Sequence, residues 1–394
     1  MSKIMAVNAG SSSLKFQLLK MPEEELITSG IVERIGMKKS VFSIKVNGEK
    51  IEETTSIPNH SNAVNLLLGK LIQHNIISSY DEIAGVGHRV VHGGDRIAES
   101  VILDDEKIEY LEGIIDLAPL HLGPNLTGIK AFQKVLPEVK HIGVFDTAFH
   151  QTMPEEAYLY AVPYEWCQNY KVRKYGFHGT SHKFITERFA KITNKKVEDV
   201  NLIIAHIGNG ASICAVKNGK SIDTSMGFTP LEGIPMGTRS GNIDPAVVEY
   251  MMKVKKKSVK EIINYLNKQS GYLGVSGLSS DSRDLVEAAK NGNHKAKLAI
   301  DVQAKRITDY ITSYNNYIGG ADAIIFTAGI GENAKYTRAN IVSRLASLGV
   351  KIDHERNDCR GIEEIISTDD SKIAVYVIPT NEEVMIARDT LALI

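Results

Sequence analysis

Asn8-Ala-Gly-Ser-Ser-Ser-Leu-Lys15 separates two apolar runs, Ile4–Val7 and Leu14–Leu19. The glycine lets the backbone approach a ligand closely, and successive N–H groups and hydroxyls can face anionic oxygens. Lys15 adds a positive point charge, which suits a phosphate group. This stretch therefore predicts a strand, a phosphate-binding turn and a second strand.

The same plan occurs twice more along the chain. An apolar run, Leu202–Ala205, leads into the turn His206-Ile-Gly-Asn-Gly210 and a return strand, Ala211–Val216. Further on, the apolar run Ala323–Thr327 is followed directly by Ala328-Gly-Ile-Gly-Glu-Asn333, which contains a pair of glycines. We interpret the first two turns as traces of two related halves, and all three as contacts to one nucleotide.

Composition restricts the class of protein. A chain of 394 residues with 43% hydrophobic and 24% charged residues is typical of a globular protein with two domains. The net charge of −1 favours neither nucleic acid nor an anionic membrane as a partner. Without a long apolar span or secretory core, the chain is expected to be cytoplasmic. Three scattered cysteines, Cys167, Cys214 and Cys359, predict neither disulfides nor a zinc framework.

Periodicity predicts an α/β protein in which strands come first and then alternate with helices. In the first half, strands are predicted at Ile4–Val7, Leu14–Leu19, Ser40–Val46, Ala84–Val91 and His141–Phe145, and helices at Ala63–His74, Asp105–Asp116 and Gly128–Val135. The second half restarts with the strands of Asn201–Val216 and ends with Ala323–Thr327 and Val375–Ile378, with helices at Asp244–Met252, Val259–Asn267, His294–Tyr317 and Asn381–Thr390. The repeat places the boundary between the halves near residue 150.

Two arginines and one acid stand where strands meet polar turns. Arg89 precedes the turn of His92-Gly-Gly94, and Arg239 lies in the glycine-flanked loop Gly237–Asn242. Both can clamp a carboxylate or phosphate with two N–H groups, although each can also be a surface arginine that caps carbonyls. Asp146 ends the run His141–Phe145, where α/β sheets often hold catalytic groups, although it can equally cap a helix.

Three further patterns have competing interpretations. His178 and His182 are four residues apart, as are His88 and His92, which is compatible with a metal site. The glutamate of the zinc protease motif is replaced by Gly179, so we favour His178 as a hydrogen-bond donor in a polar cleft. Gly219-Lys-Ser221 lacks the earlier glycine of a P-loop, since Cys214 stands there. Gly329–Ala334 with Asp353 imitates a dinucleotide-binding fingerprint, which keeps a dehydrogenase as a distant alternative.

Four motifs, in order along the chain, resemble the acetate kinases of the acetokinase family. They are Val7-Asn-Ala-Gly-Ser-Ser-Ser-Leu-Lys15, Gly87-His-Arg-Val-Val-His-Gly-Gly94, Tyr175-Gly-Phe-His-Gly-Thr-Ser-His182 and Phe326-Thr-Ala-Gly-Ile-Gly-Glu-Asn333. The resemblance implies two duplicated α/β domains of the actin-like, ribonuclease H-like fold, with mixed sheets flanked by helices and the active site in the cleft between domains. It also implies an N-terminal acetokinase domain, residues 1–150 joined by the helix 381–394, and a C-terminal nucleotide-binding and dimerisation domain, residues 151–380.

The resemblance also implies roles for individual residues. The catalytic residues would be Arg89, Asp146, His178 and Arg239, and Arg89 would bind substrate together with an acyl pocket of Val91, Leu120, Phe177 and Pro230. Nucleotide would be held by Lys15, His206, Ile207, Gly208, Asn209, Gly210, Asp281, Ser282, Arg283, Gly329, Ile330, Gly331, Glu332 and Asn333. Asn8 and Glu382 would position Mg²⁺, or alternatively Mn²⁺.

The implied reaction is the reversible conversion of ATP and acetate to ADP and acetyl phosphate by direct phosphoryl transfer in a homodimer. Acetate is ionised near pH 7, so no base is needed, and we expect Asp146 to orient a metal-bound water or an arginine. A propionate or butyrate kinase of the same family is one alternative. A second alternative is a non-catalytic ATP-driven switch, which would keep the nucleotide turns but would not need Arg89, Arg239 and His178 together.

Overall fold

A computed structural model describes residues 2–394. The chain divides into two compact units. Unit 1 contains the residues up to Phe149 together with Asn381–Ile394, and unit 2 contains His150–Thr380. Among the helices of residues 2–394, none is long and apolar enough to cross a membrane.

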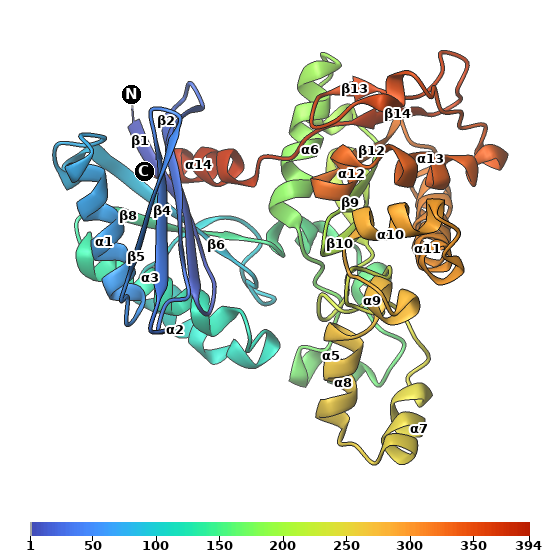
Figure 1. Ribbon diagram of the computed structural model, residues 1–394, viewed down its shortest axis with the longest axis horizontal. Coiled ribbons are helices and arrows are strands. Elements are labelled where there is room, and N and C mark those ends of the chain that lie inside the picture. The colour runs from blue at the N-terminus through green and yellow to red at the C-terminus, as the bar shows by residue number, and fades with distance from the viewer. Residues whose placement is uncertain (1) are drawn as a thin grey trace. The chain divides into compact units, whose positions relative to one another are not determined.

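Unit 1 is built on one mixed sheet of eight strands in the order β5-β4-β3-β2-β1-β6-β8-β7 (Figure 1). The strands from β1 to β5 pair antiparallel in sequence order, whereas β1, β6 and β8 pair parallel. The strands are β1 (Ser2–Ala9), β2 (Ser13–Met21), β3 (Glu25–Glu33), β4 (Ser40–Val46), β5 (Glu49–Thr55), β6 (Ile83–Val90), β7 (Val101–Ile102) and β8 (Lys140–Phe145). The polar stretch from Asn8 to Lys15 thus contains the end of β1, the hairpin turn of residues 10–12 and the start of β2.

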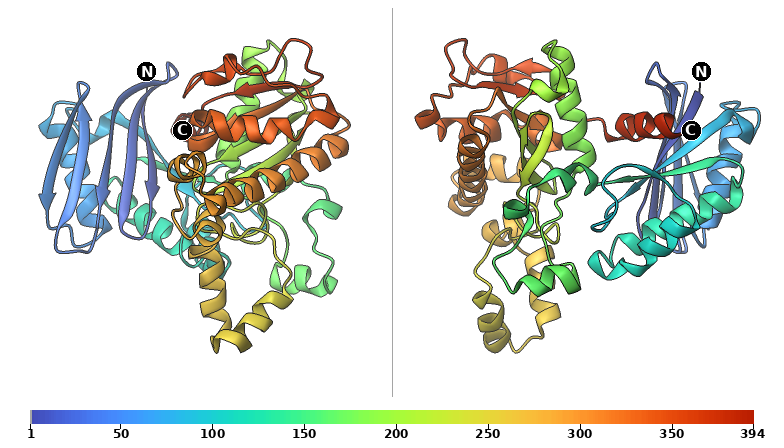
Figure 2. Two further views of the ribbon diagram at one scale, coloured as in Figure 1. Left: turned by 45° about the vertical axis from the view of Figure 1, so that its right-hand side comes forward. Right: turned by 180° about the vertical axis from the view of Figure 1, so that it is seen from behind.

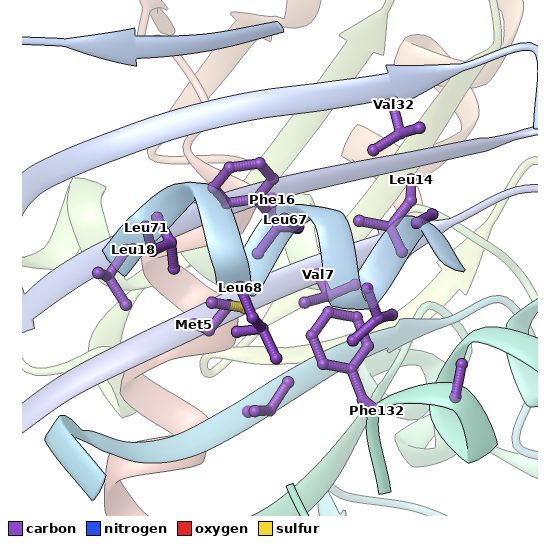
Figure 3. Close-up of a cluster of buried hydrophobic side chains, with 14 of the residues drawn as sticks. Met5, Val7, Leu14, Phe16, Leu18, Val32, Leu67, Leu68, Leu71 and Phe132 are labelled. Carbon is purple, nitrogen blue, oxygen red and sulfur yellow. The ribbon is translucent and has the colours of Figure 1, made fainter. Parts of the chain in front are cut away.

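One face of this sheet is covered by the helices α1 (His60–Gln73) and α3 (Leu122–Val135), with α2 (Asp105–Gly113) beside α3. Alternate residues of β1 and β2 point to this face, and they meet an apolar stripe of α1 to form the main core of the unit (Figure 3). Its members include Met5, Val7, Leu14, Phe16, Leu18, Leu67, Leu68, Leu71 and Phe132.

The opposite face carries the C-terminal helix α14 (Glu382–Leu393), which packs on β1 and β6 (Figures 1 and 2). Two glycines of β6 make this close approach possible. A Cβ atom at Gly87 would collide with Thr390 and Ile386, and one at Gly85 would lie 2.9 Å from the Thr390 methyl group. The packing places Glu382, the first residue of α14, on the same sheet face as Arg89, which lies two residues beyond Gly87.

Unit 2 repeats the central pattern of unit 1. Its sheet has the order β11-β10-β9-β12-β14-β13, in which the first three strands pair antiparallel and β9, β12 and β14 pair parallel. The strands are β9 (Leu202–Ile207), β10 (Ala211–Lys217), β11 (Lys220–Thr224), β12 (Ala323–Thr327), β13 (Glu364–Ile365) and β14 (Ala374–Val377). The order β3-β2-β1-β6-β8 in unit 1 has the same directions, so the duplicated α/β fold predicted from the two related turns is confirmed.

Helices flank the second sheet, with α6 packed on β9 and α11 on β9 and β10 (Figure 2). The helices are α4 (Glu155–Tyr158), α5 (Tyr164–Tyr170), α6 (Gly179–Ile192), α7 (Ala246–Lys255), α8 (Val259–Lys268), α9 (Gly271–Ser276), α10 (Ser282–Lys290), α11 (His294–Ile318), α12 (Ala328–Asn333) and α13 (Lys335–Ser343). Short 3₁₀ turns occupy Tyr80–Glu82, Ile115–Leu117, Ala148–Thr152, Val197–Asp199, Ala346–Leu348 and Arg356–Asp358.

Several elements differ from the sequence prediction. The strands β3, β5 and β11 were not predicted, because exposed and polar residues interrupt their alternation. Helix α3 begins at Leu122 and not at the predicted Gly128. Pro124 lies in the first turn of this helix, where a proline removes no internal hydrogen bond. Helix α2 ends at Gly113, before the predicted Asp116. Gly179 does not prevent a helix: it is the first residue of α6.

Candidate active site

In unit 1, Arg89 and Asp146 form an ion pair. They stand at the carboxyl ends of β6 and β8, which are parallel neighbours. The Arg89 Nε donates to Asp146 Oδ1 at 3.0 Å, and its Nη2 donates to Oδ2 at 2.8 Å. Asp146 is only 2% exposed, and its negative charge raises the pKa of Arg89. The aspartate therefore fixes the plane of the guanidinium and keeps it charged.

Three other predicted residues line a cavity of about 260 Å³ with Arg89. Asn8 on β1 and Lys15 on β2 are direct partners across the hairpin, so their side chains share one face of the sheet. Glu382 reaches the same cavity from the N-terminus of α14, where its Oε2 lies 3.7 Å from Arg89 Nη1. This cavity of unit 1 is thus lined by four cationic side chains, two carboxylates and two amides, which are Lys15, Lys45, Lys50, Arg89, Glu382, Glu383, Asn8 and Gln17.

The donor set of this cavity fits a divalent metal that is bound mainly by substrate and water. Within residues 2–394, the buried Glu382 Oε1 has no hydrogen-bond partner from the protein, and Asn8 supplies an amide oxygen. Those residues contain no cluster of three or more His, Cys, Asp or Glu side chains that could enclose an ion. Mg²⁺ commonly takes one or two protein oxygens and completes its shell with waters and phosphate oxygens.

In unit 2, two side chains converge on the turn that follows β9. The position of a Cβ atom on Gly210 would lie 3.3 Å from Arg239 Nη1 and 3.5 Å from His178 Nε2. His178 has a positive φ of 60° at the start of α6, and its ring stacks on His206 with the ring centroids 4.0 Å apart. Glycine at 210 therefore leaves open a space that an arginine and a histidine both face.

Arg239 differs from Arg89 in its charge environment. Its Nη1 donates to the carbonyl of Pro230 at 3.5 Å, and no carboxylate forms an ion pair with it anywhere in the described part of the chain. Burial lowers the pKa of Arg239. A partly buried guanidinium without a carboxylate favours an external anion as its partner.

A larger cavity of about 1230 Å³ lies beside this turn in unit 2. The predicted nucleotide residues that line it are Gly208, Asn209, Asp281, Ser282, Arg283, Gly329, Ile330 and Asn333. Asp281 caps α10 by accepting from the backbone N–H of Arg283, and so shapes one wall. Three turns far apart in sequence thus meet around one space large enough for a nucleotide.

The remaining predicted nucleotide residues do not line that cavity. The side chain of Ile207 is buried in the strand core, and Gly331 is buried within α12. Glu332 accepts a hydrogen bond from the backbone N–H of Thr380, whereas His206 Nδ1 bonds with the Ser181 hydroxyl. Gly210 faces Arg239 and His178, as described above, and Lys15 belongs to the cavity of unit 1.

The four predicted acyl-pocket residues have unequal environments. In unit 1, Val91 is half-buried and its backbone N–H donates to Asn125, while Leu120 is 73% exposed. In unit 2, Phe177 is buried and its carbonyl bonds with the His150 ring, and the Pro230 carbonyl accepts from Arg239. The exposed Leu120 lies just before Leu122, the first residue of α3.

The paired histidines and the two glycine motifs make contacts within the protein itself. His178 Nδ1 and His182 Nε2 both bond with the Ser212 hydroxyl, and His88 bonds with His141. Gly219-Lys-Ser221 spans the β10–β11 hairpin. In a dehydrogenase, Asp353 would be expected to contact a ribose. Its carboxylate instead accepts hydrogen bonds from the backbone N–H groups of Glu355 and Arg356.

Several residues that line the larger cavity were not predicted from the sequence. They are Val286, Glu287 and Lys290 on α10, Tyr336 and Ala339 on α13 with Lys335, and His354, Asn357 and Arg360 from the following loop. Val286 and Lys290 follow Ser282 at intervals of four, so helical periodicity could have found these two. No sequence signal marks the loop residues. Arg338 holds the loop in position by donating hydrogen bonds to the carbonyls of Gly331, Asn357 and Cys359.

Comparisons with known proteins agree over the full length of the chain. Residues 3–388 match the acetokinase family. The acetate kinase of a Geobacillus species is 58% identical over 393 residues, covering 100% of this chain and 99% of that protein. An acetate kinase structure from Porphyromonas gingivalis superposes with a TM-score of 0.96 at 45% identity, and a propionate kinase structure from Francisella tularensis with 0.94 at 43%, each over 100% of both chains. The chain therefore belongs to the acetokinase family.

Proposed function

We propose that this chain is an acetate kinase that catalyses the reversible reaction of ATP with acetate to give ADP and acetyl phosphate. The observation that carries the proposal is a pair of arginines that can bind anions: Arg89, held by Asp146, and Arg239, which has no carboxylate partner within residues 2–394. A nucleotide-driven switch needs no second anion site of this kind. The named relatives support phosphoryl transfer to a short carboxylate.

In the proposed reaction, a carboxylate oxygen of acetate attacks the γ-phosphorus of ATP. The new O–P bond forms as the bond from phosphorus to the β-phosphate oxygen breaks, and the electron pair leaves on ADP. Because acetate is already ionised, no group of the protein has to remove a proton. The protein contributes positioning and charge neutralisation.

The site residues have distinct parts in this reaction. Arg89 and Arg239 bind the carboxylate and the transferring phosphoryl group, and His178 Nε2 donates to an equatorial oxygen of that group. Asp146 acts through Arg89 by holding its guanidinium, as the two short hydrogen bonds indicate. Mg²⁺, held by Asn8 and Glu382, would offset charge on the ATP phosphates.

The nucleotide would bind to unit 2. The cavity of about 1230 Å³ contains the polar turn at Gly208 and Asn209 for phosphates, and apolar groups such as Val286, Ile330 and Ala339 for the base. We assign unit 1 to the carboxylate and the metal for the same reason, since its cavity contains Asn8, Arg89 and Glu382.

A trap for the acyl phosphate tests this proposal. Protein incubated with Mg-ATP, acetate and hydroxylamine should yield acetyl hydroxamate. A small apolar pocket separates substrates that differ by one methylene by only about 10- to 200-fold, so propionate should react with a penalty of that size and butyrate more slowly. Val91→Ala should reduce the difference in reactivity between acetate and propionate. The matched control, Val162→Ala, changes an exposed valine outside the predicted acyl pocket and should leave that difference unchanged.

Two outcomes would change the conclusion. No hydroxamate from folded protein with any of the three acids would remove the kinase assignment. A higher kcat/KM with propionate than with acetate would favour the propionate kinase alternative, which the Francisella relative already represents.

We also propose that the protein is a homodimer. Helix α7 exposes an apolar stripe at Val247, Tyr250 and Val254, of which Tyr250 is 65% exposed. Spacings of three and four residues place this stripe on one helix face, and such a face favours burial against a partner. The cytoplasmic location expected from composition stays a prediction.

Sedimentation analysis measures the assembly directly. The unmodified protein should sediment with twice the mass of one chain. The variant Tyr250→Asp with Val254→Asp should shift the mass toward one chain, whereas Met37→Asp, an equally exposed site in unit 1, should not. A single-chain mass for the unmodified protein would contradict the proposal.

A further inference from the structure

The hydroxyl of Ser212 lies between two histidines of unit 2. Its Oγ is 2.9 Å from His178 Nδ1 and 2.9 Å from His182 Nε2. Ser212 is on β10, directly across the ladder from His206, and both Ser212 and His182 are fully buried. The two histidines are one helical turn apart at the start of α6. The serine therefore joins an interior histidine to the one that faces the Gly210 turn.

Counting protons leaves two arrangements for this chain of hydrogen bonds. The serine hydroxyl can donate one hydrogen bond and accept two. If both histidine nitrogens donated to it, its own hydrogen would be buried without an acceptor, because Ser212 Oγ has no other hydrogen-bond partner within residues 2–394. One nitrogen therefore accepts from the serine and the other donates to it. In the first arrangement, His182 Nε2–H donates to Ser212, which donates to His178 Nδ1. In the second arrangement, both bonds are reversed and His178 carries its proton on Nδ1.

His182 distinguishes between the two arrangements. Burial lowers the pKa of His182 well below its usual value, and the neighbouring His150 and His206 act in the same direction, so its ring is neutral and carries one proton. Its Nδ1 is buried and, within residues 2–394, has no hydrogen-bond partner. A proton on His182 Nδ1 would give a buried N–H group without an acceptor. Folded proteins tolerate such a group less readily than a buried acceptor without a donor.

We infer that Ser212 and His182 are positioning residues that hold His178 in the tautomer with its proton on Nε2. That nitrogen is the one that faces the Gly210 turn beside Arg239, so the network presents an N–H donor there and not a lone pair. The functional meaning rests on the proposed role of His178 as a donor to the phosphoryl group. A lone pair in that place would repel phosphate oxygens.

The tautomer can be measured without turnover. Long-range ¹H–¹⁵N correlation spectra of the full-length, ligand-free protein report which ring nitrogen of each histidine is protonated, and loss of one set of signals in His178→Gln assigns them. At neutral pH, His178 should show a protonated Nε2 and an Nδ1 that accepts a hydrogen bond. A protonated Nδ1 in neutral His178 would overturn the inference.

Kinetics then test whether the network matters for the reaction. Ser212→Ala should lower kcat by about 10- to 100-fold, less than the 10²- to 10³-fold loss that follows complete removal of a donor, with little change in the KM for ATP or acetate. Ser212→Thr keeps the hydroxyl and should recover most of kcat. The matched control is Ser221→Ala, which removes another fully buried hydroxyl, one that bonds with His150.

Equal losses in kcat from Ser212→Ala and Ser221→Ala would reduce Ser212 to a structural residue and overturn the inference. Unchanged kcat in Ser212→Ala would do the same. If the unmodified protein made no acyl phosphate at all, the kinase proposal would fail, but the spectra would still decide the tautomer.

Discussion

Arg239→Ala is expected to lower kcat by about 10²- to 10³-fold, with a much smaller change in the Kd for ATP. Arg239 faces the Gly210 turn and has no carboxylate partner among the described residues, so its positive charge is available to stabilise the negative charge that develops during transfer. The alanine variant removes that charge without leaving an acid unpaired, and should therefore fold normally. Hydroxamate formation measures kcat, and calorimetric titration with ATP measures Kd.

Arg239→Lys provides the conservative comparison. Lysine keeps the charge but cannot form the two parallel hydrogen bonds of a guanidinium, so only part of the activity should return. Arg188→Ala is the control, since its ion pair with Glu363 lies on the surface of the same unit. Near-normal turnover in Arg239→Ala would reassign the arginine to a structural role.

Arg89→Ala is expected to cause a loss of similar size, about 10²- to 10³-fold in kcat, together with lower stability. The substitution removes the hydrogen bonds that the buried Asp146 accepts from the guanidinium, and breaking a buried pair from one side costs about 3–5 kcal/mol. The double variant Arg89→Ala with Asp146→Asn removes both charges and should be more stable than Arg89→Ala alone. Chemical denaturation measures these differences.

The same pair of substitutions separates two roles for Asp146. If the aspartate acts by holding Arg89, Asp146→Asn should lower kcat in the unmodified protein but add little in the Arg89→Ala background. Full additivity of the two effects on kcat would instead mean that Asp146 contacts the reacting groups independently of Arg89. Arg388→Ala with Glu24→Gln, a surface ion pair of unit 1, is the matched control for stability.

The fold could be predicted from the chain because its central strands are buried on both faces. Strands such as β9 and β12 are continuous apolar runs, and the polar turns after β1 and β9 mark the duplication. By contrast, β5 carries charged residues on both faces and is mostly exposed, so no alternation marks it. Helix α6 begins with a glycine because tertiary packing around His182 outweighs its weak helix propensity.

The sequence was less informative about how the site is assembled. It indicated that Asp146 ends a strand and orients a metal-bound water or an arginine, but not that this arginine is Arg89, 57 residues earlier. That pairing depends on the register of β6 against β8, and parallel strands have no connecting turn to reveal it. The loop of His354 and Arg360 reaches the large cavity for a similar reason, since buried contacts of Arg338 place it there.

The docking of α14 against Gly85 and Gly87 has a consequence for the order in which the protein is made. Unit 1 is discontinuous, and Glu382 reaches the cavity of Asn8 and Arg89 only when Asn381–Ile394 has packed on β6. A ribosome completes the strands of unit 1 long before it adds this segment. The nascent chain can therefore form unit 2 before α14 docks, and Glu382 joins the cavity of unit 1 only after unit 2 has been synthesised.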